Sequence, residues 1–295
     1  MKRIFFISII GLALFSGACS KKNNPAAEQY QKAEELYRQG DYARAKVAID
    51  SIAKIDPRAF DEIRAGMQLM RRVDLSINER NLAYVDSLLP IRQAFQKDLL
   101  SKFKLQKDEK YQEEGNYVFK KDRNAGSVNR SCLRIQVTED GQMQLMSVYS
   151  GATKLNHESV KVELPDGTFA LTSVIPYDGA NNYRFVNAGN TTEVVTYKGK
   201  QMRSVADLVY NSNGAKIKVS YEGKRPFSFI MDNNTREAIS ASYELALVMS
   251  EIKQLQREKA IATKTIEILK KQIADHEHDC LLYTSDAADD LIGVD

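Results

Sequence analysis

Residues 245–273 read LALVMSEIKQLQREKAIATKTIEILKKQI, and this stretch decides how the rest of the chain is organised. Its seam positions alternate in steps of three and four: Leu245, Val248, Ile252, Leu255, Lys259, Ala262, Ile266, Leu269 and Ile273. More than three heptads of this spacing, with charged residues between, predict a coiled-coil helix over residues 233–279. Its partner is either another helix of the same chain or a second copy, so a homo-oligomer through residues 245–273 remains open.

A stripe of similar character lies earlier in the chain. Ile91, Phe95, Leu99, Phe103 and Gln106 recur at helical spacing. We expect this helix to begin at Pro90, because a proline suits the first turn of a helix, and to end near Gln112. The preferred picture is an antiparallel pair formed by this helix and residues 233–279.

Residues 115–232, between the two stripes, predict an antiparallel β domain. Short runs rich in β-branched and aromatic residues alternate with turn residues such as Pro165-Asp166-Gly167 and Asp178-Gly179, which is typical of hairpins. The expected strands are 116–121, 133–138, 142–149, 159–164, 168–175, 183–186, 193–197, 215–221 and 227–231, with one short helix at 202–210. The fold class is therefore α+β, with N-terminal helical hairpins, an inserted antiparallel β domain and a long C-terminal helix.

Residues 28–114 are expected to be helical. Two apolar stripes flank the turn Gly40-Asp41, and Asp56-Pro57 closes the second. This run is similar to one tetratricopeptide unit over residues 26–58, about a tenth of the chain. One such unit cannot bury its own faces, so we expect the helical segment 58–89 to pack beside it. Tyr30, Tyr37 and Tyr42 are the candidate partner-binding residues on its concave face.

The N-terminus predicts export. Lys2 and Arg3 precede an apolar run, Ile4–Phe15, which is shorter than the roughly 20 residues a bilayer span needs. The ending Ser16-Gly17-Ala18-Cys19 resembles a bacterial lipobox, with Ser16 where that motif usually has Leu. The resemblance implies a signal peptide at 1–18, lipid attachment at Cys19, a linker at 19–27 and a membrane partner through the lipid. An ordinary signal peptide with an incidental cysteine is the alternative.

The other end is expected not to be native. Residues 280–290, CLLYTSDAADD, resemble the in-frame translation of a transposase sequencing adapter, so we assign 280–295 to an adapter-derived tail. The native chain would then end, or be cut short, near Asp279. This removes Cys280 from the cluster 276–280, whose two histidines are in any case two residues apart and on different helix faces. No metal site is expected there.

The sequence contains little that predicts catalysis. None of the nucleophile-elbow, zinc-helix, phosphate-loop or dinucleotide motifs occurs, so we expect no enzyme activity, no cofactor and no metal. Cys132 is expected to be a buried strand residue and His157 an ordinary loop or strand-edge residue. Basic residues near Lys120, Lys121, Arg123 and Arg130 are expected to form a solvated face, with no nucleic-acid partner.

Two short motifs indicate the kind of organism from which the chain comes. Asp50-Ser51-Ile52 and Asp86-Ser87-Leu88 resemble the Asp-Ser/Thr-apolar motif that is O-glycosylated in exported Bacteroidota proteins, which makes Ser51 and Ser87 candidate glycosylation sites. The resemblance implies a Bacteroidota-like lipoprotein. The lysines after Cys19 lack the acidic run used for surface display, so the expected location is the cell envelope, at the outer membrane and facing the periplasm.

Three functional hypotheses follow. The first is a non-enzymatic scaffold or protein-interaction module of the envelope. The second is a ligand- or glycan-binding module that uses Tyr149, Tyr177 and Tyr183 of the β domain. The third is an enzyme with an unrecognised site, which requires a pocket that gathers Asp or Glu with His157.

Overall fold

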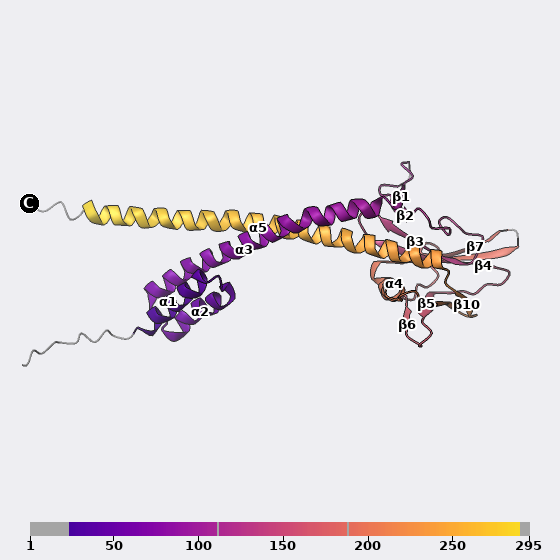
Figure 1. Cartoon of the computed structure of the whole chain (residues 1–295), viewed down its shortest axis with the longest axis horizontal. Coiled ribbons are helices and arrows are strands. Elements are labelled where there is room, and N and C mark those ends of the chain that lie inside the picture. Colours follow the sequence, from indigo (N-terminus) through magenta and orange to yellow (C-terminus); the bar gives the residue numbers. More distant parts are fainter. Residues whose placement is uncertain (1–23, 111, 188, 290–295) are drawn as a thin grey trace, which may run out of the picture. The chain divides into compact units, whose positions relative to one another are not determined.

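The computed structural model describes residues 24–110, 112–187 and 189–289 of the chain. The predicted signal peptide, Cys19 and residues 290–295 of the tail lie outside this part. The described chain is α+β, as predicted, with helices first, antiparallel sheets in the middle and a long helix last (Figure 1). Its described residues divide into two compact units, one within residues 24–79 and 265–289 and one within residues 80–264.

The first unit contains the helical hairpin that the N-terminal pattern predicts. Helices α1 (Pro25–Arg38) and α2 (Tyr42–Ile55) are joined by a turn at Gly40, whose φ of 75° favours glycine. Asp41 caps α2 by accepting a hydrogen bond from the backbone N–H of Arg44 at 3.1 Å. The small buried residues Ala33 and Ala45 let the two helices approach closely.

Helix α3 (Phe60–Leu100) supplies the neighbour that the hairpin needs. A Cβ on Gly66 would lie 3.0 Å from Cδ1 of Ile52 and 3.3 Å from Cγ2 of Ile49, so α3 meets α2 at a position where only glycine fits without adjustment. Lys46 on α2 bonds Asp74 on α3 at 2.8 Å. The cluster of apolar side chains in this unit also takes in Leu69 and Val73 of α3.

The second unit is built on two antiparallel sheets. The larger sheet has the order β1-β2-β3-β4-β8-β7, and the smaller has the order β10-β9-β5-β6. Its strands are β1 (Phe103–Gln106), β2 (Asn116–Phe119), β3 (Cys132–Thr138), β4 (Met143–Gly151), β5 (Ser159–Glu163), β6 (Phe169–Leu171), β7 (Asn182–Asn187), β8 (Asn190–Lys198), β9 (Lys218–Glu222) and β10 (Phe227–Ile230). A 3-10 turn η1 (Gly199–Gln201) and helix α4 (Arg203–Tyr210) follow β8.

One apolar core holds this unit together. It gathers buried side chains from both sheets, from α4 and from the first part of α5 (Asn233–Asp289). Leu145 of the larger sheet, Val219 of the smaller sheet, Val205 of α4 and Leu245 of α5 are all fully buried. Figure 1 shows α4 and the start of α5 beside the strands.

The predicted coiled-coil seam is buried within the chain. In the second unit, Arg92 of α3 bonds Glu251 of α5 at 3.3 Å, and Lys259 of α5 bonds Asp86 of α3 at 2.7 Å, so the helices run antiparallel. In the first unit, Lys270 bonds Glu79 at 3.0 Å. The seam side chains of α5 that are buried are Leu245, Val248, Ile252, Leu255, Ala262, Ile266 and Leu269.

Three details of the helical prediction are wrong. Ile91 and Phe95 of the predicted stripe are 63 and 37% exposed and are not buried in the seam with α5. Residues 103–106 are not helical but form the edge strand β1, in which Phe103 pairs with Phe119 of β2. The helix ends at Leu100, and the strand-containing region begins before residue 115. Pro90 does not start a helix but lies inside α3. Pro90 offers no N–H to the carbonyl of Asp86, and packing of α3 on α5 keeps the helix continuous through that site.

No helix in the described residues combines the length and apolar character of a membrane-spanning segment.

Candidate functional site: a groove beside α5 and a sealed polar triad

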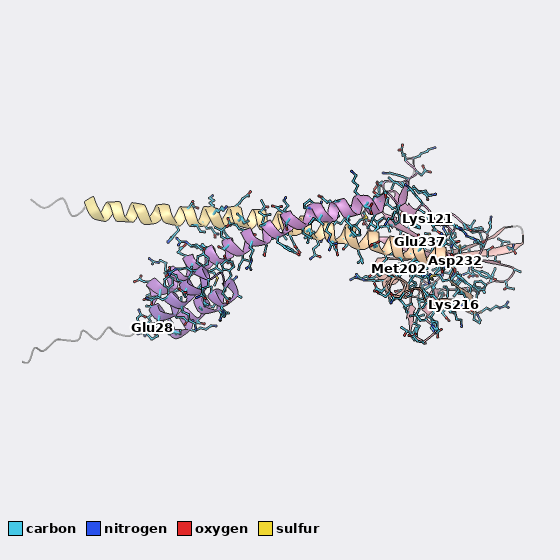
Figure 2. The ribbon with its side chains drawn as sticks, viewed as in Figure 1. Glu28, Lys121, Met202, Lys216, Asp232 and Glu237 are labelled. Carbon is cyan, nitrogen blue, oxygen red and sulfur yellow. The ribbon has the colours of Figure 1, made fainter. Side chains whose placement is uncertain are left out.

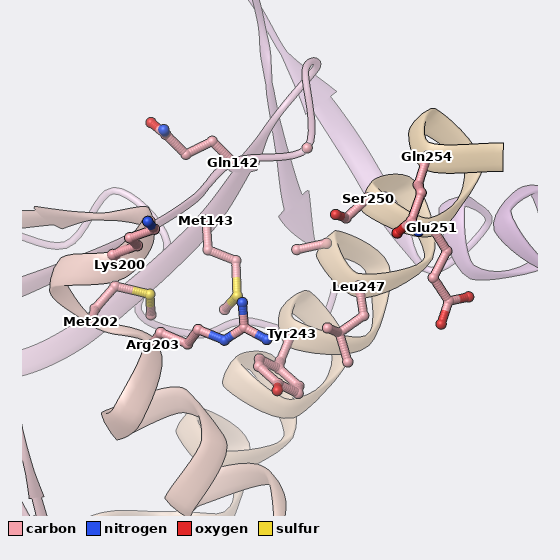
Figure 3. A pocket seen from close by; sticks show the side chains of 13 residues that line it. Gln142, Met143, Lys200, Met202, Arg203, Tyr243, Leu247, Ser250, Glu251 and Gln254 are labelled. Atoms are coloured by element: carbon pink, nitrogen blue, oxygen red, sulfur yellow. The ribbon is translucent and has the colours of Figure 1, made fainter. Parts of the chain in front are cut away.

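A groove lies between α5 and the β domain (Figure 3). Three segments form it: the turn before β4, the chain from Gly199 to Arg203, and the face of α5 from Tyr243 to Gln254. Its volume is about 290 Å³, at the lower end of the range for ligand pockets. The space therefore suits one or two side chains of a partner, or a small molecule.

The groove has an apolar floor and a charged rim. Met143 and Met202 are buried at its base, and Leu247 of α5 lies opposite them. Thioether side chains adapt their shape to varied partners. Lys200 and Arg203 lie on one side of the rim and Glu251 lies on α5 at the other side (Figure 3).

The cationic side of the rim is partly neutralised by α4. Nε of Arg203 lies 4.0 Å from a carboxylate oxygen of Asp207. The hydroxyl of Tyr243 donates to the same carboxylate, and this hydrogen bond, followed by burial, raises the pKa of Tyr243. Tyr243 is therefore a neutral donor at neutral pH. Lys200 is the more available cation for an acidic group at the groove.

The turn between β3 and β4 is pinned against α5. Gly141 has a φ of 86°, and a Cβ at this residue would lie 3.0 Å from Cβ of Met249. The ammonium group of Lys253 donates to the carbonyl of Asp140. One wall of the groove is therefore held in place by direct contact between the turn and the helix.

A Ser–His–Glu triad lies in the core of the β domain. Nδ1 of His157 lies 2.9 Å from Oε2 of Glu193, and Nε2 of His157 lies 2.8 Å from Oγ of Ser147. An Nδ1–H directed at the carboxylate leaves Nε2 to pair with the serine hydroxyl. Tyr221 stacks on the imidazole with ring centroids 4.8 Å apart.

The carboxylate of Glu193 accepts several hydrogen bonds. It accepts from the backbone N–H groups of Leu155, Asn156 and His157 at 2.8, 2.9 and 3.1 Å. Burial opposes ionisation of this group. The bonds from the His157 ring and from the backbone outweigh burial and lower the pKa of Glu193 to about 2. The side chain is therefore a carboxylate at neutral pH.

The triad is closed to solvent. The exposed fractions of Ser147, His157 and Glu193 are 0, 1 and 2%. Their order matches that of a hydrolase triad, but a substrate carbonyl has no path to Oγ of Ser147 in this conformation. The arrangement joins β4 and β8 of the larger sheet to the loop before β5 of the smaller sheet, which is a structural role.

His157 lies in the loop just before β5, as the expectation of a loop or strand-edge residue has it, but its burial and its hydrogen bonds are not those of an ordinary loop residue. Its ring is fully buried and both ring nitrogens have partners. Ser147 and Glu193 lie 10 and 36 residues away in the sequence, so no local motif reveals the set. The prediction for Cys132 is confirmed, because the thiol is buried and burial raises its pKa.

The three candidate partner-binding tyrosines are only partly exposed. Tyr30, Tyr37 and Tyr42 pack against the apolar cluster of the first unit. The rings of Tyr37 and Tyr42 are 5.9 Å apart, and the hydroxyl of Tyr37 lies 3.3 Å from Oγ of Ser76 on α3. These side chains pack where the hairpin contacts α3. Only a small part of their surface is therefore accessible to a partner.

The aromatic residues of the β domain do not gather on one face. Tyr149 is buried in the core, and Tyr183 is half-buried. Tyr177 is exposed, but the guanidinium of Arg184 lies 4.3 Å from its ring centroid and covers one face. A stacking platform for a sugar ring would need free aromatic faces.

The candidate glycosylation sites lie on helices. Ser51 is on α2 and its hydroxyl donates to the carbonyl of Val47 at 2.7 Å, while the hydroxyl of Ser87 on α3 donates to the carbonyl of Tyr84 at 2.7 Å. Ser87 is exposed and Ser51 is half-buried. Glycosylation of either serine stays a prediction.

Basic residues do gather at the start of α5. Lys121, Arg123 and Arg130 line one depression together with Asp232 and Glu237. Nζ of Lys121 lies 3.8 Å from Glu237, and both are labelled in Figure 2. The positive charge there is thus balanced by nearby carboxylates. Among the described side chains, which end at His276, no three His, Cys, Asp or Glu residues are arranged as metal ligands.

Comparison with protein-family models, with curated proteins and with solved structures found no match for this chain.

Proposed function

We propose that this protein is a lipid-anchored, non-enzymatic interaction protein of a bacterial cell envelope, held at the outer membrane and facing the periplasm. The observation that carries the proposal is the open groove between α5 and the β domain. Its occupant would be a segment of a protein partner that places an apolar side chain against Ala246 and Leu247 of α5, above the buried Met143 and Met202.

The chemistry of the groove favours a peptide segment. The floor of methionine and leucine side chains offers apolar contact and can adapt its shape. The rim has Lys200 on one side and Glu251 on the other, and these charges can orient the backbone of the partner or a charged residue next to its inserted side chain. Glu251 is already bonded to Arg92, so its charge is shared. The free cation at Lys200 favours an acidic residue next to the inserted side chain.

The sealed triad supports a role other than catalysis. A nucleophilic serine must reach its substrate, and Ser147 is fully buried beneath the strands. The ionised carboxylate of Glu193 already accepts hydrogen bonds from backbone N–H groups, which occupy its lone pairs. The triad is thus explained by the stability of the two-sheet domain.

Site-specific photocrosslinking in native membranes tests the proposal. A photoreactive residue at Ser250, on the groove face of α5, is expected to capture a defined partner, and the matched exposed serine Ser228 on β10 is the control. Ala246→Trp, which fills the groove, is expected to abolish the Ser250 adduct. Equal adducts at both serines, or a Ser250 adduct that survives Ala246→Trp, would overturn the assignment of the groove.

A further inference from the structure

Helix α3 carries a second apolar stripe that no described part of the chain covers. Tyr84 and Ile91 are each 63% exposed, Phe95 is 37% exposed, and Leu88 is half-buried. We call these four residues the outer stripe. The residues that follow the first three in chain order are Val85, which is buried, Leu89, which packs against the core, and Arg92, which bonds Glu251 of α5. The helix therefore has two adjacent apolar faces, which is the pattern of a helix that packs on two neighbours.

Within residues 81–96, helix α3 has no unpaired charge. Among the 16 residues 81–96 only Asp86 and Arg92 are charged, although charged residues make up 27% of the whole chain. Asp86 is bonded to Lys259 and Arg92 to Glu251, both on α5. A solvated helix face normally carries several free charges, so this one has the composition of a contact surface.

The outer stripe reads the same in both directions. An aromatic residue stands at each end, Tyr84 and Phe95, and an aliphatic pair, Leu88 and Ile91, stands at the centre, with spacings of four, three and four. A two-fold axis through the middle of the stripe would place Tyr84 against Phe95 of a second copy and Leu88 against Ile91. Self-complementary patches of this kind are what isologous dimers use.

We propose that the outer stripe is the interface of a symmetric homodimer in which two copies of α3 pack antiparallel. The paired ions leave no like-charge repulsion between the copies. Small residues beside the stripe, Ala83, Ser87 and Ala94, allow the two helices to approach closely, which requires a Ser87 without a glycan. The proposal is independent of the partner-binding groove.

The expected contact is modest in size. In an antiparallel pair, residues that precede the seam on both helices share one face, so Ile261 of α5, which is 66% exposed, extends the same surface. A face of 16 helical residues is about 24 Å long, and two helices side by side are about 20 Å wide. Such a face buries about 1,000 Å² in total, the lower limit for a specific interface. A reversible dimer is therefore expected.

Analytical ultracentrifugation of the full chain tests this interface. The wild type is expected to show a concentration-dependent monomer–dimer equilibrium below about 300 µM. Ile91→Glu is expected to raise the dissociation constant at least about tenfold. The matched control is Val47→Glu on α2, where the replaced side chain is 66% exposed and lies outside the stripe.

Charge variants test the register. Tyr84→Lys and Phe95→Glu are each expected to weaken the dimer, and mixing the two variants, or combining both changes in one chain, is expected to restore it at low salt. A parallel arrangement would set like charges against each other in the combined variant, which would then stay monomeric. A wild type that is monomeric throughout, an equal effect of Val47→Glu, or failure of the combined variant to recover would each overturn the proposal.

Discussion

Nδ1 of His157 lies 2.9 Å from Oε2 of Glu193, and this contact joins the two sheets of the β domain. Glu193 belongs to β8 of the larger sheet, and His157 precedes β5 of the smaller one. Two polar side chains inside an apolar core are costly unless every hydrogen-bonding group is satisfied. The bonds described above satisfy them.

Glu193→Gln is expected to lower the free energy of unfolding at pH 7 by about 3 kcal/mol, because an amide cannot accept all the hydrogen bonds that the carboxylate accepts. Chemical denaturation measures the change. The exposed Glu267→Gln on α5 is the control and should alter stability by less than about 0.5 kcal/mol. An equally small effect at Glu193 would show that the triad is dispensable.

The contribution of Glu193 to the stability of the folded protein should decrease as the pH falls. Its folded pKa of about 2 lies below its ordinary value of 4.5, so the contribution is fully present above pH 4.5 and is lost as pH falls towards 2. The difference in unfolding free energy between wild type and Glu193→Gln should shrink over that window. A difference that stays constant from about pH 7 to about pH 2.5 would contradict the explanation that hydrogen bonds lower the pKa of Glu193.

Ser147 should not react with a fluorophosphonate probe in the folded protein, because its hydroxyl is fully buried. Intact mass and peptide mapping after incubation measure the labelling. Ser147→Ala should give the same spectrum and cost about 1 kcal/mol of stability through the lost hydrogen bond. Labelling of Ser147 without denaturant would reveal an opening that admits a substrate.

Gly66→Val should lower the stability of the first unit by about 2 kcal/mol, since its side chain would collide with Ile52 at a helix crossing. Gly66→Ala should cost less, because the helical preference of alanine, about 1 kcal/mol over glycine, offsets part of the contact. Thermal unfolding followed by circular dichroism gives both values. The exposed Met67→Val is the matched control and should change little.

Cys19→Ala should move the protein from the membrane fraction to the soluble periplasmic fraction. Under the proposed function, the lipid on Cys19 supplies the attachment to the membrane. Fractionation and the mass of the mature N-terminus measure the outcome. Persistence of the variant in the membrane fraction, or an unmodified wild-type Cys19, would contradict the anchor.

Most strands could be predicted from the sequence, because their signals are local. The turn Pro165-Asp166-Gly167, for example, separates β5 from β6, and Gly167 takes the positive φ that the pattern requires. The strand β1 was missed because Phe103 and Gln106 fit a helical stripe equally well. Only the pairing of Phe103 with Phe119 decides between the two, and pairing is a long-range property.

The site residues could not be predicted for the same reason. The groove brings together Met143, Met202 and Leu247, which lie far apart in the sequence, and the triad joins Ser147 to Glu193 through a loop histidine. The seam of α5 was visible in the sequence. Its partner within the chain became clear only from the ion pairs Arg92–Glu251 and Lys259–Asp86.

The contact between Gly141 and Met249 also bears on how this protein can diverge. Any substituent at position 141 would suffer both an unfavourable backbone angle and a collision with the helix. Shortening Met249 would not relieve this contact, because the nearest atom is Cβ of Met249, 3.0 Å away, and every residue except glycine keeps a Cβ. In a saturation library, glycine should therefore be strongly preferred at position 141, with asparagine, which takes a positive φ at Asn156 and Asn213, as the best tolerated substitute.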